Sequence, residues 1–223
     1  MSDRTVTAIV VGFNHANTLG RCFDSLFGSQ ELDALEVIYV DNNSSDSSVA
    51  ATSWHEQIIV VENQENLGFA TAVNQGLERA TGRYCALVNP DTAIGPECLA
   101  RLCGYLERNQ GVGLVGPRLL NEEGNEQVSL APYPSPGALA LARVGRGTKD
   151  PSRLWLVGAM VMAETALLRQ LGGLDEGFFL YGEDMDLSYR VQQAGRAVHL
   201  DESVHITHTG NPRWHPERLI RVY

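Results

Sequence analysis

The stretch Tyr84-Cys85-Ala86-Leu87-Val88-Asn89-Pro90-Asp91 joins a continuous apolar run to a tight polar turn. Pro90 fixes its own φ and disfavours helical geometry at the residue before it, so we expect Asn89 to end a strand and Asp91 to project from its carboxyl end. In open α/β sheets, ligands bind at this edge. Because Asn, Pro and Asp are common turn formers, the stretch taken alone also fits an ordinary strand-ending turn.

Strand-like and helix-like segments alternate through the first half of the chain. The strand-like runs are continuous and rich in β-branched residues, which is typical of strands buried on both faces. This order predicts an α/β fold in which helices flank a mostly parallel central sheet. The expected strands are Val6–Phe13, Leu35–Val40, Ile58–Val61, the run ending at Asn89, and Val112–Val115. The expected helices are Asn17–Phe27, one after Asp46, Phe69–Ala80 and Pro96–Asn109.

The second half of the chain is less regular. Pro, Gly and basic residues between Ala131 and Arg153 predict a mobile loop. This loop is either a plain solvated connector or a segment that binds a phosphate-bearing ligand. Order returns with the apolar run Trp155–Ala163, helices near Glu164–Leu171 and Glu183–Ala194, and short strands near Ala197–Leu200 and Val204–Thr207. We expect one domain over residues 1–210 and a short tail over 211–223.

Composition limits the classes of function. With 223 residues and 43% hydrophobic content, the chain is long enough for one substantial core. A formal charge of -10 argues against nucleic acid as a partner. The four cysteines lack CxxC spacing and predict reduced core thiols. No apolar run suits a signal peptide or a membrane span, so we expect a cytoplasmic protein, with peripheral association at the inner face of the membrane left open.

Two polar stretches follow expected strands. In Asp41-Asn42-Asn43-Ser44-Ser45-Asp46, an Asp can accept from the imide N–H of a pyrimidine, while Ser44 and Asp46 are suited to capping the next helix. For those two residues, capping alone is the simpler interpretation. Asn66-Leu67-Gly68-Phe69-Ala70 resembles a second loop-to-helix junction, although Gly beside Asn is more often just a turn.

One motif is misleading. Gly111-Val112-Gly113-Leu114-Val115-Gly116 matches the dinucleotide fingerprint GxGxxG, which requires a preceding strand and a following helix. Here a helix precedes the motif and a strand contains it, so we reject it. Neither a P-loop nor a nucleophile elbow occurs.

An acidic segment near the carboxyl end carries five carboxylates within twelve residues, from Asp175 to Asp186. Asp186 is spaced for an i,i+4 ion pair with Arg190, and Glu183 suits the first turn of a helix, so structural roles are expected for both. Asp184, at the helix entrance beside apolar side chains, is the expected general base.

Two histidines, His205 and His208, lie three residues apart in an expected strand, which places them on opposite faces. His208 precedes Thr209-Gly210, and the glycine frees the turn to approach a cation. For a lone histidine a satisfied structural role is the simpler interpretation, and of the two His208 is the expected metal ligand.

Taken together, these motifs resemble the family 2 inverting glycosyltransferases of GT-A fold, particularly bacterial rhamnosyltransferases of cell-surface polysaccharide synthesis. Besides the stretches quoted above, the resemblance rests on Val10-Val11-Gly12-Phe13-Asn14, Gly158-Ala159-Met160, Gly172-Gly173-Leu174-Asp175-Glu176, Phe178-Phe179 and Glu183-Asp184-Met185-Asp186-Leu187. These motifs occur in order over about residues 5–210.

The resemblance implies transfer of a sugar from a nucleoside-diphosphate sugar to a glycan or lipid-linked glycan. It places the nucleotide on Asn14 and Asp41, the donor pocket at Gly68 and Asn74, a divalent Mg²⁺ or Mn²⁺ on Asp91, and the base at Asp184. Further expected substrate contacts are Asn43, Asn89 and Glu183. The family's metal motif often has two carboxylates, whereas the first position here is Asn89, so His208 and diphosphate oxygens must complete the coordination. Gly12 also stands where members of this family commonly have a larger or hydroxylated residue, at the edge of the base site.

Relatives of this kind usually continue beyond the point where this chain stops, at Tyr223. We therefore expect the acceptor side to be minimal or completed by a partner, which includes a homo-oligomer. The residues Arg213, Trp214, Arg218 and Arg221 suit either a solvated tail or a membrane surface. A non-catalytic sugar-nucleotide-binding subunit of a polysaccharide assembly complex is the alternative function. A sugar-nucleotide pyrophosphorylase would need a glycine-rich basic loop after the first strand, and Gly12-Phe13-Asn14-His15 is not one.

Overall fold

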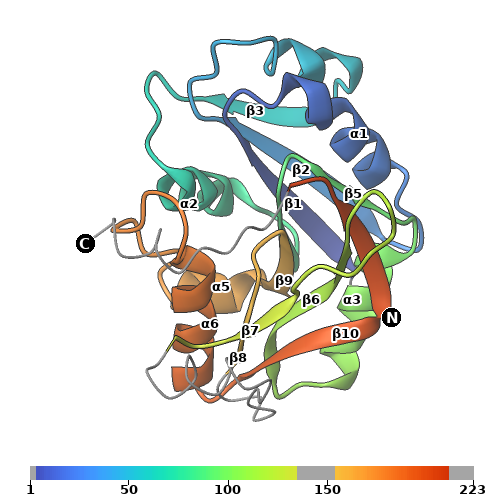
Figure 1. Ribbon diagram of the computed structural model, residues 1–223, viewed down its shortest axis with the longest axis vertical. Helices are drawn as coiled ribbons and strands as arrows, with labels where there is room; N and C mark the ends of the chain where they lie inside the picture. The colour runs from blue at the N-terminus through green and yellow to red at the C-terminus, as the bar shows by residue number, and fades with distance from the viewer. Residues whose placement is uncertain (1–3, 135–153, 211–223) are drawn as a thin grey trace.

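An eight-stranded sheet runs through the molecule (Figure 1), in the order β3-β2-β1-β4-β9-β6-β10-β5. The computed structural model describes residues 4–134 and 154–210. The strands of this sheet are β1 (Thr5–Gly12), β2 (Ala34–Asp41), β3 (Ile58–Glu62), β4 (Tyr84–Val88), β5 (Thr92–Ile94), β6 (Val112–Leu120), β9 (Met160–Glu164) and β10 (Ala197–His208). A small second sheet pairs β7 (Leu130–Pro132) with β8 (Leu154–Leu156).

The large sheet is mostly parallel, as the sequence predicts. Strands β1 to β4 pair in parallel, as do β6 and β10. Strand β9 joins these two halves because it runs antiparallel to both β4 and β6, and β5 runs antiparallel to β10 at the edge. The carboxyl ends of the parallel strands β1 to β4, β6 and β10 therefore lie at one common edge of the sheet.

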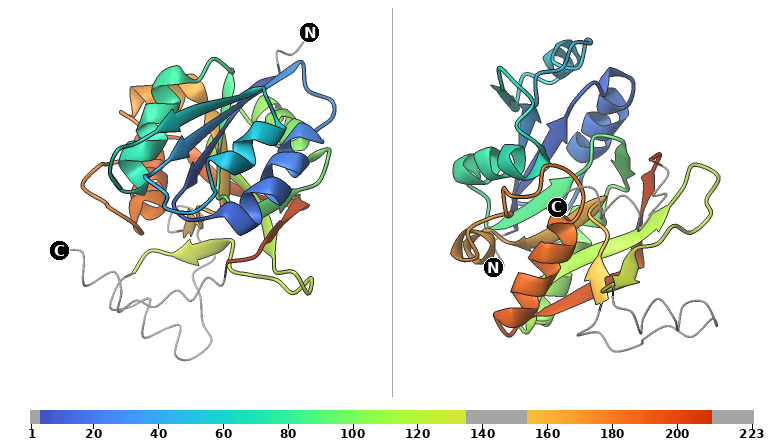
Figure 2. Two further views of the ribbon diagram at one scale, coloured as in Figure 1. Left: turned by 90° about the horizontal axis from the view of Figure 1, so that it is seen from above. Right: turned by 60° about the vertical axis from the view of Figure 1, so that its left-hand side comes forward.

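Helices cover both faces of the sheet. In the left view of Figure 2, α1 (Ala16–Phe27, blue) and α2 (Phe69–Arg79, teal) lie on opposite sides of β1 and β2. Helix α3 (Cys98–Arg108) packs into the same hydrophobic cluster as α1. Helices α5 (Thr165–Gln170) and α6 (Glu183–Gln193) pack into the cluster that contains α2. Alternate residues of β1 feed the two cores, since Val6, Ala8 and Val10 face α1 while Ile9 and Val11 face α2. Burial on both faces explains the continuous apolar runs.

Several sequence predictions about secondary structure are wrong in detail. After Asp46 there is only a short 3₁₀ helix, η1 (Ala50–Trp54). The run Trp155–Ala163 is split between β8 and β9, and the two strands expected after residue 197 form one strand with a register shift between Asp201 and His205. Strands β5 and β7 were not expected; both are three residues long and depend on partners distant in sequence.

Two other predictions, the free core cysteines and the rejection of the glycine motif, are confirmed. All four cysteines are buried and free, and β6 contains the rejected glycine motif. Across the described ranges, no helix combines the length and apolar character needed to cross a membrane. The expected basic loop lies mostly outside the described residues, and the expected tail wholly so.

Candidate active site

Polar residues from several strands meet at the carboxyl edge of the large sheet. At this edge Gly12 pairs with Asp41, and Val88 pairs with Met160 at the start of antiparallel β9. On the other side, His208 at the end of β10 pairs with Thr92. The turn that carries Asp91, the loop before β9 and the end of β10 therefore lie together.

Asp91 and His208 form a pair at this edge. Their side chains approach to 3.4 Å between His208 Nε2 and Asp91 Oδ1, and both are largely buried, with 8% of His208 and 18% of Asp91 exposed. The Thr209 N–H donates to the backbone oxygen of Asp91 at 3.0 Å, which fixes the two chains side by side. Burial raises the pKa of Asp91, but the contact with a charged His208 outweighs it and leaves that pKa below its ordinary value. Sequence reasoning had selected both residues.

The surroundings of this pair fit a divalent cation. Asp91 Oδ1 is buried without a hydrogen-bond partner among the described residues. A Cβ at Gly210 would lie 2.6 Å from Asp91 Oδ2 and 2.8 Å from His208 Nε2, so glycine leaves open a space that both donors face. Carboxylate and imidazole suit Mn²⁺, and carboxylate with water suits Mg²⁺. Since the described part of the chain holds no group of three acidic, His or Cys side chains around one point, other ligands must come from substrate or water.

Asp184 lies in the first turn of α6, which the chain enters through two left-handed residues, Tyr181 at φ 70° and Gly182 at φ 100°. Its Oδ2 accepts the Gly158 N–H at 2.9 Å and its Oδ1 accepts the Met185 N–H at 2.8 Å. A Cβ at Gly158 would come within 3.1 Å of Asp184 Cβ, so glycine permits this approach. The expected Asp186–Arg190 ion pair is confirmed at 2.6 Å.

The loop between β8 and β9 connects Asp184 to the Asp91 turn. Gly158 donates to Asp184, and the carbonyl of the next residue, Ala159, accepts the Asn89 N–H at 2.9 Å. Asp184 and the turn bearing Asp91 are thus attached to adjacent residues of one loop. The sequence motif that contains Gly158 did not predict a role for this residue. Its position between β8, which pairs with β7, and β9, which pairs with β4 and β6, is visible only in the structure.

Glu183 and Asp184 form a pair of neighbouring carboxyl groups, of which Glu183 is buried and Asp184 partly buried. Burial raises the pKa of Asp184, while the N–H groups of Gly158 and Met185 act in the opposite direction. Burial and then the Asp184 charge raise the pKa of Glu183. Glu183 is 7% exposed, and its Oε2 is without a hydrogen-bond partner among the described residues. Burial and the neighbouring charge therefore both favour the neutral form of Glu183.

The polar stretch after β2 folds against the end of β1. Asp41 is buried, and its two oxygens accept the Tyr39 hydroxyl and the Ser44 N–H, at 2.8 and 2.7 Å. Tyr39 fills the space that a side chain at Gly12 would need, which explains the glycine there. Asn14, at φ 59°, accepts the Ser45 N–H at 2.8 Å.

Three neighbours in the same stretch differ in their exposure and contacts. Asn43 is exposed at φ 67°. Asp46 does not cap the following helix as expected, since its Oδ2 accepts the Ala16 N–H of α1 at 3.1 Å. Asn42, which sequence reasoning passed over, is buried and donates to Asn66 and Gly68 while accepting from Asn63 and Leu67.

Gly68 and Asn74 hold the acidic segment in place rather than facing open space. Gly68 adopts φ 85°, and the Phe69 N–H donates to the Phe179 carbonyl at 2.8 Å. The Asn74 amide donates to the Leu174 carbonyl and to Glu176, and accepts the Leu174 N–H, all at 2.8–2.9 Å. These contacts position the loop before α6, and the expected contact of Gly68 and Asn74 with a donor stays a prediction.

Gly68→Ala is expected to destabilise the fold by about 2–4 kcal/mol, because φ 85° with ψ 166° is almost restricted to glycine and the new methyl would lie 2.7 Å from the Phe179 oxygen. Urea unfolding measures the loss. Gly95→Ala is the control, since a Cβ there meets nothing within 4 Å. Equal stability of the two variants would contradict this account.

The fold and the carboxyl-edge site together define a GT-A type glycosyltransferase domain. A family model described as Glycosyl transferase family 2 matches residues 7–169, so the chain belongs to this family.

Individual relatives agree with this assignment. The N-acetylglucosaminyl-diphospho-decaprenol L-rhamnosyltransferase of Mycobacterium tuberculosis is 25% identical over 190 residues, covering 72% of this chain and 62% of the relative. The pre-mycofactocin glycosyltransferase of the same species is 30% identical over 215 residues, covering 93% of this chain and 43% of the relative. The chain thus spans less than two thirds of these relatives.

A solved structure shows the same fold. The mannosyltransferase PcManGT of Pyrobaculum calidifontis, in complex with GDP-Man and Mn²⁺, superposes with a TM-score of 0.72 at 22% identity, covering 97% of this chain and 60% of that one.

Proposed function

We propose that this chain transfers a sugar from a nucleoside-diphosphate sugar to a hydroxyl of a glycan or lipid-linked glycan, with inversion at the anomeric carbon and with a divalent cation on the donor diphosphate. The observation that carries the proposal is the attachment of Asp184 and the Asp91 turn to adjacent residues, Gly158 and Ala159. A carboxylate held that close to a cation-binding turn can act on an acceptor while the diphosphate is bound.

In the proposed reaction, Asp184 removes the proton of the acceptor hydroxyl as its oxygen forms a bond to the anomeric carbon. The bond from that carbon to the diphosphate oxygen breaks on the opposite face, and the nucleoside diphosphate leaves with the electron pair. Asp91 and His208 would hold the cation, which neutralises charge on the departing diphosphate. Asn14, Asp41 and Asn43 are assigned to the nucleoside, and Asn89 and Glu183 to the transferred sugar or acceptor.

The relatives guide the choice of substrates. A rhamnosyltransferase whose name includes a decaprenol-linked acceptor supports an L-rhamnosyl donor and a lipid-linked acceptor. An acceptor of that kind would place the enzyme peripherally at the inner face of the membrane. The mannosyltransferase solved with Mn²⁺ supports a divalent cation.

The test is incubation of the protein with UDP-, dTDP- and GDP-sugars and simple acceptors, with and without Mn²⁺. We expect product by mass spectrometry only with Mn²⁺, and an inverted anomeric configuration by NMR. Retained configuration would overturn the proposed mechanism. Nucleotide binding without product from any pair would favour a non-catalytic subunit.

A further inference from the structure

The side-chain amide of Gln127 makes three contacts with the turn that ends β10. Its Oε1 lies 2.9 Å from His208 Nδ1, and its Nε2 donates to the carbonyls of His208 and Gly210, both at 3.1 Å. The backbone is anchored as well, because the Gln127 N–H donates to Leu119 of β6 at 2.8 Å. Gln127 is therefore fixed to the sheet at one end and to the His208 turn at the other.

These contacts determine the orientation of the amide and, through it, the tautomer of His208. Carbonyl oxygens only accept, so the Gln127 atom facing two of them must be the NH₂ group. The Oε1 that remains is also only an acceptor, and His208 Nδ1 must therefore carry a hydrogen. In the neutral imidazole this leaves the lone pair on Nε2, the atom 3.4 Å from Asp91 Oδ1.

A protonated His208 would direct its Nε2–H at Asp91, whereas the neutral tautomer presents one acceptor toward another, an arrangement that a cation between them would satisfy. We infer that Gln127 is a positioning residue that holds the His208 Nδ1–H tautomer and so increases the affinity of the Asp91–His208 pair for a divalent cation. The inference rests on the proposed function, which requires that cation. Partners that orient a ligating His typically change metal affinity by about 10–100-fold.

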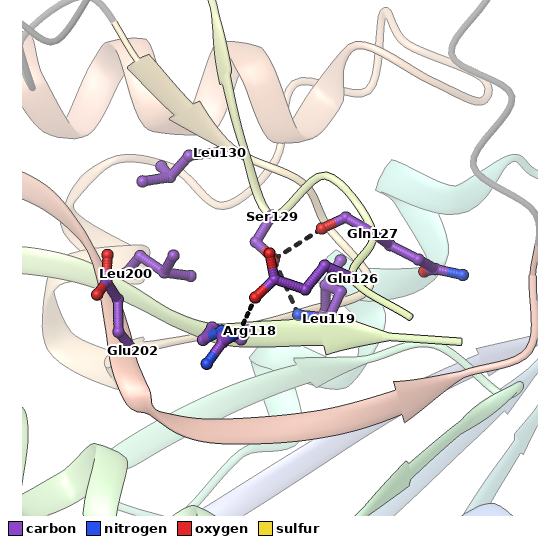
Figure 3. A pocket seen from close by; sticks show the side chains of 8 residues that line it. All are labelled: Arg118, Leu119, Glu126, Gln127, Ser129, Leu130, Leu200 and Glu202. Atoms are coloured by element: carbon purple, nitrogen blue, oxygen red, sulfur yellow. Dashed lines mark hydrogen bonds and ion pairs between the residues drawn. The ribbon is translucent and has the colours of Figure 1, made fainter. Parts of the chain in front are cut away.

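A cavity of about 410 Å³ borders the same residue and is lined by Arg118, Ser129 and Glu202, among others. Figure 3 shows the amide of Gln127 directed away from Leu130, Leu200 and Glu202 on the far side of this cavity. The polar end of Gln127 therefore contacts the His208 turn, and the cavity carries no part of the inference.

The test compares Gln127→Leu, which removes all three polar contacts, with Gln127→Glu, which keeps an acceptor for Nδ1–H. Mn²⁺ is titrated in the presence of UDP, GDP or dTDP and free Mn²⁺ is followed by EPR. We expect Gln127→Leu to weaken Mn²⁺ binding about 10–100-fold. Gln127→Glu should weaken it less, because it keeps the acceptor for Nδ1–H although its second oxygen faces the His208 and Gly210 carbonyls. Gln57→Leu, at an exposed glutamine elsewhere on the surface, is the matched control.

A second readout needs no metal. In ¹⁵N NMR of the imidazole at a pH where His208 is neutral, the wild type should show the Nδ1–H tautomer and Gln127→Leu a mixture. An unchanged tautomer, or unchanged Mn²⁺ affinity in Gln127→Leu beside a wild type that binds Mn²⁺, would overturn the inference alone. If the wild type binds no Mn²⁺ with any of the three nucleotides, the metal role of the proposed function fails and the inference fails with it.

Discussion

Asp184→Asn is expected to lower kcat by about 10²–10⁴-fold, the contribution typical of a general base, and to leave donor binding almost unchanged. Asparagine has nearly the same shape, and its Oδ1 can still accept the Gly158 N–H, so the loop between β8 and β9 should keep its position. The substitution removes the capacity to take a proton and one of the two accepted N–H bonds, that from Met185. Steady-state kinetics with the best donor and acceptor, together with calorimetry of donor binding, separate these two effects.

The matched control for this variant is Asp186→Asn, two residues further along α6. Its carboxylate is paired with Arg190 and is assigned to structure, so kcat should change little. Turnover retained in Asp184→Asn would remove Asp184 from the mechanism. Equal loss in both variants would point to damage to α6 instead.

The role of Asp184 as a base also predicts the direction in which the activity of the wild type changes with pH. The base works only when ionised, and burial raises the pKa of Asp184, so kcat/KM should fall on acidification at a higher pH than an exposed aspartate would cause. Activity should rise with pH and then level off. Because Glu183 is a buried neighbour, the acid limb reports the pair rather than one residue.

Most of the sheet could be predicted because its strands and helices carry their signals locally. Strands β1, β2 and β4 are buried on both faces and read as apolar runs at any position in the sheet. Strand β5 could not be predicted, since its three residues become a strand only by pairing with β10, more than a hundred residues away. The helix expected after Asp46 is shorter than predicted, because the side chains of Asp46 and Ser48 accept hydrogen bonds from the backbone N–H groups at the start of α1.

The candidate site divides in the same way. Asp91, Asp184 and His208 stand in local motifs at strand ends or a helix start, and a sequence is enough to single them out. Gln127 and Gly158 depend on contacts that only the assembled sheet creates. Gly68 and Asn74 lie in a recognisable junction, but its partner is the acidic segment a hundred residues later, so their contacts could not be read locally.

Asp91→Asn should weaken nucleoside-diphosphate binding in Mn²⁺ by more than the roughly 10–100-fold expected for a residue that only orients a ligand, because it removes the one carboxylate of the proposed site. The contacts of Thr209 go to the backbone oxygen of Asp91 and should survive the substitution. Binding measured without metal should be unchanged. The loss should therefore appear only as a reduced difference between calorimetric titrations with and without Mn²⁺.

A matched Asp–His pair on the surface provides the control. Asp24 lies 3.0 Å from His55, but the Asp24 side chain is 71% exposed, so water can satisfy it and Asp24→Asn should leave Mn²⁺-dependent binding unaffected. The two pairs share their chemistry and differ in burial and in the space that Gly210 leaves open. If Asp91→Asn binds the nucleotide in Mn²⁺ as the wild type does, Asp91 does not hold the cation, and the orphaned Oδ1 needs another explanation.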